Sequence, residues 1–141
     1  MSFKRPESVL VIVYTLDTQV LMLERTEPRG FWQSVTGSLH EGESAIAAAR
    51  RELEEETGLV GEIIETGLSN TFPIIPAWRA RYAPEVTHNH EMVFALQLDE
   101  LCQVLLNPNE HVQQLWLPRE QAAEKASSWS NRDAILALVP A

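Results

Sequence analysis

Three glutamates lie close together near the end of a run of residues that predicts a helix. Residues 44–57 (SAIAAARRELEEET) are rich in Ala, Leu, Arg and Glu, and Ser44 and Gly58 are suitable residues for the two helix ends. Glu52, Glu55 and Glu56 are spaced at i, i+3 and i+4, so their carboxylates converge on one face. The spacing predicts a concentration of negative charge on one side of this helix.

This acidic face is unfavourable unless positive charge lies beside it. None of the three glutamates is followed four residues later by Lys or Arg, and acid in the last turn faces the negative end of the helix dipole. We therefore expect the face to have no basic partners. A divalent cation such as Mg²⁺ or Mn²⁺ would remove the conflict, because both prefer carboxylate and carbonyl oxygens. The alternative is a solvated acidic face that binds nothing.

The residues around the glutamates follow a fixed spacing. Gly37 is followed after five residues by Glu43, and seven residues then precede Arg51-Glu52-Leu53. One residue precedes Glu55-Glu56, and one more precedes Gly58-Leu59. With every fixed position filled, this stretch resembles the Nudix box. The resemblance implies an α/β fold, namely an α/β/α sandwich with a mixed β-sheet, and the hydrolysis of a nucleoside diphosphate linked to another group.

The resemblance also implies roles for individual residues. Glu52 and Glu56 would bind the cations, Glu55 would do so directly or through water, and the backbone of Gly37 would be a further metal ligand. Glu110 resembles a further Nudix glutamate, on a loop before a strand that contains Trp, and would be a metal ligand or the general base. The expected catalytic residues are thus Glu55, Glu56 and Glu110, with Mg²⁺ as cofactor and Mn²⁺ as a substitute.

The loop that starts at Gly37 has two expected features. Glycine tolerates unusual dihedral angles and carries no side chain, so the backbone can approach a metal or phosphate closely. Glu43 and Arg51 are expected to pair and to fix the loop on the helix. We therefore do not count Arg51 as catalytic.

Length, charge and cysteine content limit the class of protein. A chain of 141 residues predicts one domain over residues 1–141, and composition does not set its oligomeric state. The 11 Lys and Arg against 20 Asp and Glu give a net charge of −9, which disfavours nucleic acid and acidic membranes but allows a small phosphorylated substrate beside bound cations. Cys102 is the only cysteine, so no internal disulfide is expected. Residues 1–6 lack the apolar core of a signal peptide and residues 9–14 are too short to span a bilayer, so we expect a cytoplasmic protein.

Hydrophobic patterning predicts the elements that position these residues. Residues 8–15 and 20–25 are expected to form a hairpin, and residues 91–98 and 112–117 are expected to be further strands. Residues 118–126 predict a helix, and residues 127–133 open another one, with a capping box at Ser130 and Asp133. Residues 59–69 are expected to be extended, and residues 71–76, which contain two prolines, to be an irregular segment and not a central strand.

Three further features each allow two interpretations. Trp32 is expected in the core rather than in a ligand platform. Residues 78–82 alternate aromatic and basic side chains, which fits either a strip that binds a heterocycle and its phosphates or a packed hairpin with solvated arginines. His88 and His90 are expected in an exposed turn rather than in a zinc site.

Four stretches outside the box resemble one bacterial branch of the Nudix family. They are residues 4–6 (KRP), 31–38 (FWQSVTGS), 81–84 (RYAP) and 128–132 (SWSNR). Enzymes of this branch release diphosphate from dihydroneopterin triphosphate in folate synthesis, and they also hydrolyse some deoxynucleoside triphosphates, notably dATP. The resemblance and the charges place Lys4, Arg25 and Thr36 on the substrate, Ser128 at the pocket rim, and Phe72, Pro73, Ile74 and Ile75 beside the ring.

Two other functions stay open at this point. A general housecleaning Nudix pyrophosphatase, acting on damaged nucleotides or dinucleoside polyphosphates, would carry the same box. A non-catalytic Nudix module that senses a nucleotide would more often carry a degenerate box, whereas this one is intact. Metal-dependent turnover separates the enzyme from the module, and a substrate panel separates the two enzymes.

Overall fold

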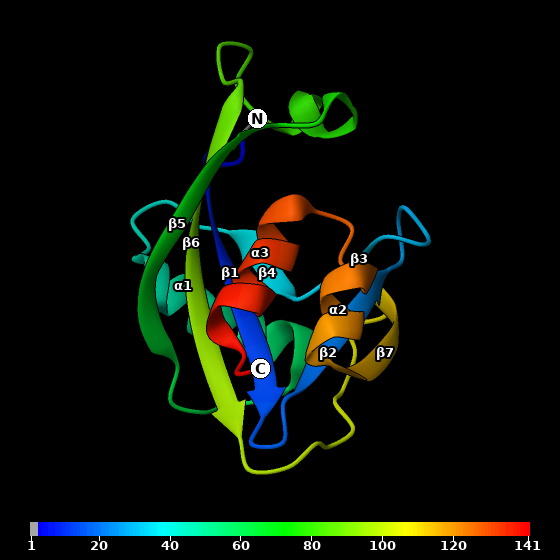
Figure 1. Cartoon of the computed structure of the whole chain (residues 1–141). Coiled ribbons are helices and arrows are strands. Elements are labelled where there is room, and N and C mark those ends of the chain that lie inside the picture. The colour runs from blue at the N-terminus through cyan, green and yellow to red at the C-terminus, as the bar shows by residue number, and fades with distance from the viewer. Residues whose placement is uncertain (1–2) are drawn as a thin grey trace.

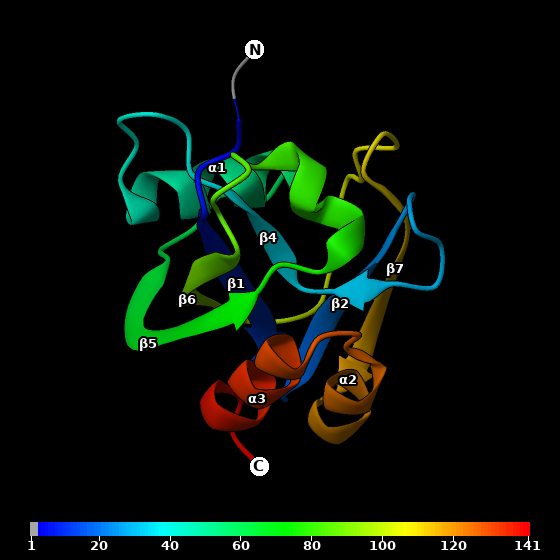
Figure 2. The ribbon, with the colours of Figure 1, turned by 90° about the horizontal axis from the view of Figure 1, so that it is seen from above.

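The computed structural model describes residues 3–141, which form a mixed β-sheet between two layers of helix. Figures 1 and 2 show α1 (Ala45–Thr57) on one face of the sheet, with α2 (Arg119–Lys125) and α3 (Trp129–Leu138) on the other. The strands are β1 (Glu7–Thr15), β2 (Gln19–Arg25), β3 (Trp32–Gln33), β4 (Val35–Ser38), β5 (Ile64–Pro73), β6 (His88–Leu98) and β7 (His111–Pro118). This arrangement confirms the predicted α/β/α sandwich with a mixed β-sheet.

Strand β1 is the centre of the sheet, whose strand order is β3-β2-β1-β6-β5. It runs parallel to β6 along its whole length, from Glu7↔His90 to Thr15↔Leu98. On its other side β1 changes partner, because β4 pairs with residues 8–11 and β2 pairs at Tyr14. The predicted β1–β2 hairpin is confirmed. Strand β4 contacts α1, so its glycine, Gly37, lies between the central strand and that helix.

The alternating side chains of β1 supply both hydrophobic cores. Val9, Val11 and Val13 pack in the cluster that also contains Ala49 and Leu53 of α1. Leu10 and Ile12 pack in the second cluster, with Ala134 and Ile135 of α3 and with Trp32. A strand covered by helices on both faces is apolar at successive positions, which explains the unbroken run VLVIV. Trp32 is 7% exposed, which confirms its predicted place in the core.

Helix α1 has the ends that its sequence predicts. The Ser44 side chain accepts a hydrogen bond from the Ala47 backbone N–H at 3.3 Å. Gly58 has a φ of 75° and donates its N–H to the Glu54 carbonyl at 2.8 Å, a left-handed stop that suits glycine. Both ends of α1 are therefore set by local sequence.

The segment after α1 differs from its prediction in part. Residues 71–73 belong to β5, so the expectation of an irregular segment is wrong for them. β5 pairs only with β6 and lies at the edge of the sheet, where a proline such as Pro73 breaks no ladder on its free side. The expectation that this segment is not a central strand is confirmed.

Two interpretations from the sequence are wrong, namely the packed-hairpin alternative for residues 78–82 and the turn predicted at His88 and His90. Residues 76–81 form a 3₁₀ helix, η1 (Pro76–Arg81), and not a hairpin, because Pro76 at its first position favours helical φ. His88 and His90 begin β6, where each pairs with a residue of β5, and so do not lie in a turn. Within residues 3–141, neither histidine belongs to a group of potential metal ligands, and no helix is long and apolar enough to cross a membrane.

Helix α3 begins two residues before the predicted capping box. Ser128 has extended dihedral angles and its side chain accepts from the Asn131 N–H at 3.2 Å, so Ser128 is the cap. Ser130, the predicted cap, lies inside the helix and is buried. The prediction chose the wrong serine because Ser128 and Ser130, with one residue between them, are each followed by a sequence that can form a helix.

Asn131 attaches α3 to the segment that leads into β4. Its Oδ1 accepts from the Ser34 backbone N–H at 2.8 Å, and its Nδ2 donates to the Ser34 Oγ at 3.0 Å. Both residues are buried, with exposed fractions of 1%. The backbone N–H and the hydroxyl of Ser34 therefore cannot hydrogen-bond to water instead when the Asn131 side chain is removed.

We predict that Asn131→Ala lowers the free energy of unfolding by about 1–3 kcal/mol, because the buried Ser34 N–H loses its acceptor and the Ser34 hydroxyl keeps only its weak bond to the Met22 sulfur. Urea unfolding followed by circular dichroism measures this change. Asp133→Ala is the matched control on the exposed side of the same helix, with an expected change within about 0.5 kcal/mol. Equal stability of the two variants would contradict the role of Asn131.

Candidate active site

One large cavity, of roughly 1230 Å³, opens between α1, β4, η1, the start of β7 and the N-terminal end of α3. Its size suits a heterocycle that carries several phosphates. Every site residue predicted from the sequence lines it, namely Lys4, Arg25, Thr36, Gly37, Glu52, Glu55, Glu56, Phe72, Pro73, Ile74, Ile75, Glu110 and Ser128. The structure thus brings residues from all parts of the chain into one place.

Glu52 packs directly against the backbone of Gly37. A Cβ atom built on Gly37 would lie 2.2 Å from the Glu52 Cδ, well inside van der Waals contact. Gly37 is not among the glycines with positive φ, so an unusual dihedral angle does not explain the need for glycine here. The absence of a side chain does, and the Glu52 carboxylate occupies the space that it leaves.

Arg51 lies among four acceptors and ties the loop to α1. Its Nε and Nη2 donate to the two carboxylate oxygens of Glu43 at 2.8 Å each, and Nη2 also donates to the Ser38 carbonyl at 3.0 Å. The predicted Glu43–Arg51 pair is confirmed. The guanidinium lowers the pKa of Glu43 to about 2, and the same hydrogen bonds raise the pKa of Arg51.

The expectation that the acidic face has no basic partner is wrong for two of the three glutamates. Arg51 Nη1 donates to Glu52 at 2.5 Å and to Glu55 at 3.3 Å. The partner precedes the glutamates instead of following them, which a search four residues downstream cannot detect. Arg51 therefore neutralises part of the face, but its ion pairs reach Glu52 and Glu55 and not Glu56.

Glu56 is the most buried of the three carboxylates, with an exposed fraction of 1%. Burial raises its pKa well above the ordinary value, and the neighbouring Glu52 and Glu110 raise it further. Its Oε1 has no hydrogen-bond partner among the residues that the structure describes. Glu110 is more exposed, and burial of its carboxyl, followed by the charges of Glu52 and Glu55, raises its pKa also. These carboxylates are packed more closely than their own charges favour.

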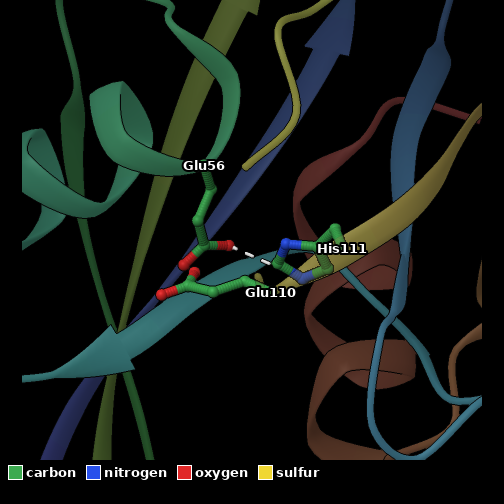
Figure 3. A group of neighbouring side chains, drawn as sticks. All are labelled: Glu56, Glu110 and His111. Carbon is green, nitrogen blue, oxygen red and sulfur yellow. Dashed lines mark ion pairs between the residues drawn. The ribbon is translucent and has the colours of Figure 1, made fainter. Parts of the chain in front are cut away.

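His111 joins this group and was not among the predicted site residues. Side-chain ligand atoms of Glu56, Glu110 and His111 all lie within 4.8 Å of one another (Figure 3). The Gln33 amide donates to His111 Nε2 at 3.2 Å, which places the ring proton on Nδ1. Burial, and then the charge of Arg25, lower the pKa of His111 to about 4. The ring is therefore neutral at pH 7, and its 3.9 Å approach to Glu56 is not a pairing of charges.

Three of the basic side chains that line the cavity, Lys4, Arg25 and Arg81, influence one another's charge. Burial and repulsion from Arg81 and Arg25 lower the pKa of Lys4, although the residue as a whole is exposed. Burial and Arg81 likewise lower the pKa of Arg25. The guanidinium of Arg25 lies 5.0 Å from the centre of the Trp78 ring, and that of Arg81 lies 6.0 Å from it. Cations held together in this way form a site for a group with several negative charges.

The NUDIX domain family matches this chain over residues 4–138. The chain belongs to the Nudix family. It is 45% identical over 139 residues to a dihydroneopterin triphosphate diphosphatase of Escherichia coli (strain K12), covering 94% of this chain and 91% of that one. It is 39% identical over 142 residues to the Haemophilus influenzae protein of the same name, covering 96% and 88%. The solved structure of the E. coli dihydroneopterin triphosphate pyrophosphohydrolase matches with a TM-score of 0.92 and 43% identity, over 99% of this chain and 98% of that one.

Nudix hydrolases use divalent cations, and the residues of this cavity suit one. Glu56 Oε1 is a buried carboxylate oxygen with no partner in residues 3–141, and Glu52 is held against Gly37 by a close fit. Carboxylate oxygens are the ligands that hard divalent cations prefer. The close packing of acids that raises the pKa of Glu56 and Glu110 is what such an ion would relieve.

We predict that Gly37→Ala leaves the chain folded but weakens both turnover and cation binding, because the new Cβ displaces the Glu52 carboxylate. The change in melting temperature on adding Mg²⁺ should shrink or vanish in the variant, since a cation that binds the native state stabilises it. Diphosphate release measures turnover and circular dichroism checks the fold. An unchanged Mg²⁺ effect together with full turnover would show that Glu52 can move without consequence.

Proposed function

We propose that this Nudix hydrolase cleaves dihydroneopterin triphosphate to dihydroneopterin monophosphate and diphosphate, a step of folate biosynthesis. The observation that carries the proposal is the likeness to two dihydroneopterin triphosphate diphosphatases at 45% and 39% identity over almost the whole chain. The cavity supports it, because acidic, basic and aromatic side chains line one space. Side activity on dATP and other nucleoside triphosphates belongs to the same proposal.

The acidic group is proposed to hold Mg²⁺, with Mn²⁺ as a substitute. Glu52 and Glu56 are the main ligands, Glu55 and Glu110 are further ligands, and the Gly37 backbone borders the site. The bound cation would neutralise phosphate charge and lower the pKa of an attacking water. Arg51 stays outside this set, because its donors are committed to Glu43, Glu52, Glu55 and the Ser38 carbonyl.

Three of the glutamates are proposed to act in catalysis. Glu55 and Glu110 are exposed and can reach water, whereas Glu56 is buried beside them. Glu110 lies in the turn directly before β7, and its side chain approaches Glu56 (Figure 3). We therefore propose Glu110 as a base or a ligand, and Glu55 and Glu56 as the residues that orient the attacking water.

The remaining predicted residues are proposed to bind the substrate. Lys4 and Arg25 would bind the phosphates, because both line the cavity and Arg81 lies close enough to lower the pKa of each. The Thr36 hydroxyl donates to the Val9 carbonyl at 2.8 Å, so toward the substrate it can only accept a hydrogen bond. It therefore suits a hydroxyl of the substrate rather than a phosphate. The segment formed by Phe72, Pro73, Ile74 and Ile75 would flank the ring, and Ser128 would lie at the rim.

The two alternative functions are not favoured. The relatives at 45% and 39% identity bear the name of the pterin enzyme, and not that of a general pyrophosphatase. A sensing module would not need the close fit of Glu52 on Gly37, which is intact. A single domain over residues 1–141 and a cytoplasmic location stay predictions, and the family match over residues 4–138 supports the first of them.

A substrate panel in ¹⁸O-water tests this proposal. We expect dihydroneopterin triphosphate to have the highest kcat/KM among pterin and purine triphosphates with Mg²⁺. Diphosphate and a monophosphate should appear together, and mass spectrometry then shows which of them carries the label. Early orthophosphate, with a diphosphate ester accumulating, would point to a phosphatase. A higher kcat/KM for a damaged purine nucleotide would favour the housecleaning function.

Glu56→Gln tests the role of the buried carboxylate. We expect the variant to fold and to lose turnover by roughly 10²- to 10³-fold, the range for removing one group that stabilises transition-state charge. Glu54→Gln is the matched control, because Glu54 is exposed on the same helix and does not line the cavity. Near-normal turnover of folded Glu56→Gln protein at saturating Mg²⁺ would exclude the proposed role.

A further inference from the structure

Three buried side-chain atoms lack a hydrogen-bond partner within residues 3–141, and all three belong to residues that line the one large cavity. Glu56 Oε1 and His111 Nδ1 lie in the acidic group described above. The third atom is Oδ1 of Asn89, on β6, which is not part of that group. Buried polar atoms are almost always paired in native proteins, so an unpaired one that lines a cavity marks a place where a ligand completes the pairing.

Asn89 is held in place through its other end. Its Nδ2 donates to the Ser8 Oγ at 2.7 Å, joining β6 to β1. The Asn89 side chain is 5% exposed and Ser8 is 8% exposed, so water does not compete freely for this bond. The bond fixes the amide plane and leaves the carboxamide oxygen as the free end.

The surroundings of Asn89 are polar although the same sheet face is apolar further along. Toward α3 this face carries Leu10, Ile12 and Val93, which pack in the second hydrophobic cluster. Ser8 lies two residues before Leu10 on β1, and the buried Glu91 lies two residues before Val93 on β6. Asn89 lies two residues before Glu91 on the same face of the sheet. The side chain of Ser130 on α3 hydrogen-bonds to Glu91, and Asn70 on β5 donates to Glu91 at 3.5 Å. The sheet thus changes from core to a polar surface where the cavity begins.

Two aromatic rings border this polar surface. Phe72 pairs with Asn89 across β5 and β6, and its ring meets that of Trp129 edge to face, with centres 6.3 Å apart. Both rings line the cavity, and Trp129 is 46% exposed. Aromatic faces beside a fixed hydrogen-bonding group suit a flat heterocycle that carries polar atoms on its edge.

We propose that Asn89 determines which heterocycle the enzyme accepts, its carboxamide oxygen accepting a hydrogen bond from an N–H group on the edge of the ring. This inference rests on the proposed function and deepens it. A pterin and a guanine both present a ring N–H beside an amino group, adenine presents an amino group beside an acceptor, and unsubstituted purine presents no such donor. The oxygen of Asn89 therefore selects for rings with donors on this edge.

A purely structural role predicts a different behaviour. If Asn89 only braced β6 against β1, removing either partner of the Asn89–Ser8 bond would have the same effect, and all substrates would respond alike. Ser8→Ala removes the brace but leaves the carboxamide oxygen, whereas Asn89→Leu removes both at similar side-chain volume. Asn89→Asp keeps an oxygen acceptor at the same position.

The experiment compares these variants on dihydroneopterin triphosphate, dGTP and the triphosphate of unsubstituted purine deoxyriboside. For Asn89→Leu we expect KM to rise about tenfold for the two donor-bearing substrates, with little change in kcat, and to stay within about twofold for the purine substrate. Asn89→Asp should keep the discrimination, and it replaces Asn89→Leu as the decisive variant if the latter does not fold. Ser8→Ala should lower the melting temperature without changing the ratio of KM values.

Binding of neopterin, which carries the pterin ring without phosphates, gives a measurement that is independent of hydrolysis. Its fluorescence titration should show a Kd about tenfold higher for Asn89→Leu than for the unaltered protein or Ser8→Ala. An equal loss for all three triphosphates, an equal loss in Ser8→Ala, or loss of discrimination in Asn89→Asp would overturn the proposal. If the protein turns over dGTP but not dihydroneopterin triphosphate, the proposed function fails, while the comparison of dGTP with the purine substrate still decides the role of Asn89.

Discussion

The close fit of the Glu52 carboxylate on the bare Cα of Gly37 sets how near helix α1 comes to strand β4. Glu52 cannot retreat, because the next residue, Leu53, is 1% exposed and packs in the core with Val9 and Val11 of β1. The same helix rotation that buries Leu53 therefore presses Glu52 against the strand and buries Glu56 one turn later. The hydrophobic effect on one side of α1 thus holds carboxylates together on the other, against their mutual repulsion.

The charges around this contact are distributed unevenly. Arg51 compensates Glu52 and Glu55 from the N-terminal side and holds the loop through Glu43, but nothing comparable faces Glu56 within residues 3–141. Lys4 and Arg25 line the same cavity, yet none of the ion pairs in the described part of the chain joins either of them to a glutamate. Acid and base are thus kept apart within one cavity. A polyphosphate that enters with a divalent cation can satisfy both groups together, which neither group can do for the other.

The parts of the fold and site that could be predicted are those that depend on local sequence. The ends of α1 follow from Ser44 and Gly58, and the converging glutamates follow from helical periodicity. The missed parts depend on pairs that are distant in the chain. His111 meets Gln33 across 78 residues, and Asn89 meets Ser8 across 81, so no pattern within one element reveals either pair. Ser128 and Ser130 show that local sequence can also be ambiguous, because the helix could start after either serine. The contact of Ser130 with Glu91 on β6 distinguishes the two.

The unpaired polar atoms that line the cavity restrict the chemistry of its ligand more than the volume of the cavity does. Each buried polar group without a partner costs free energy until a partner arrives. Here they fall into two places in one cavity, a carboxylate and imidazole in the acidic group and an amide oxygen between aromatic rings. A phosphate that carries a divalent cation, or a bare heterocycle, would satisfy only one of these places. The proposed cation site and the proposed ring contact at Asn89 would together require a ligand whose phosphates and hydrogen-bonding ring are joined in one molecule, as they are in a pterin or purine triphosphate.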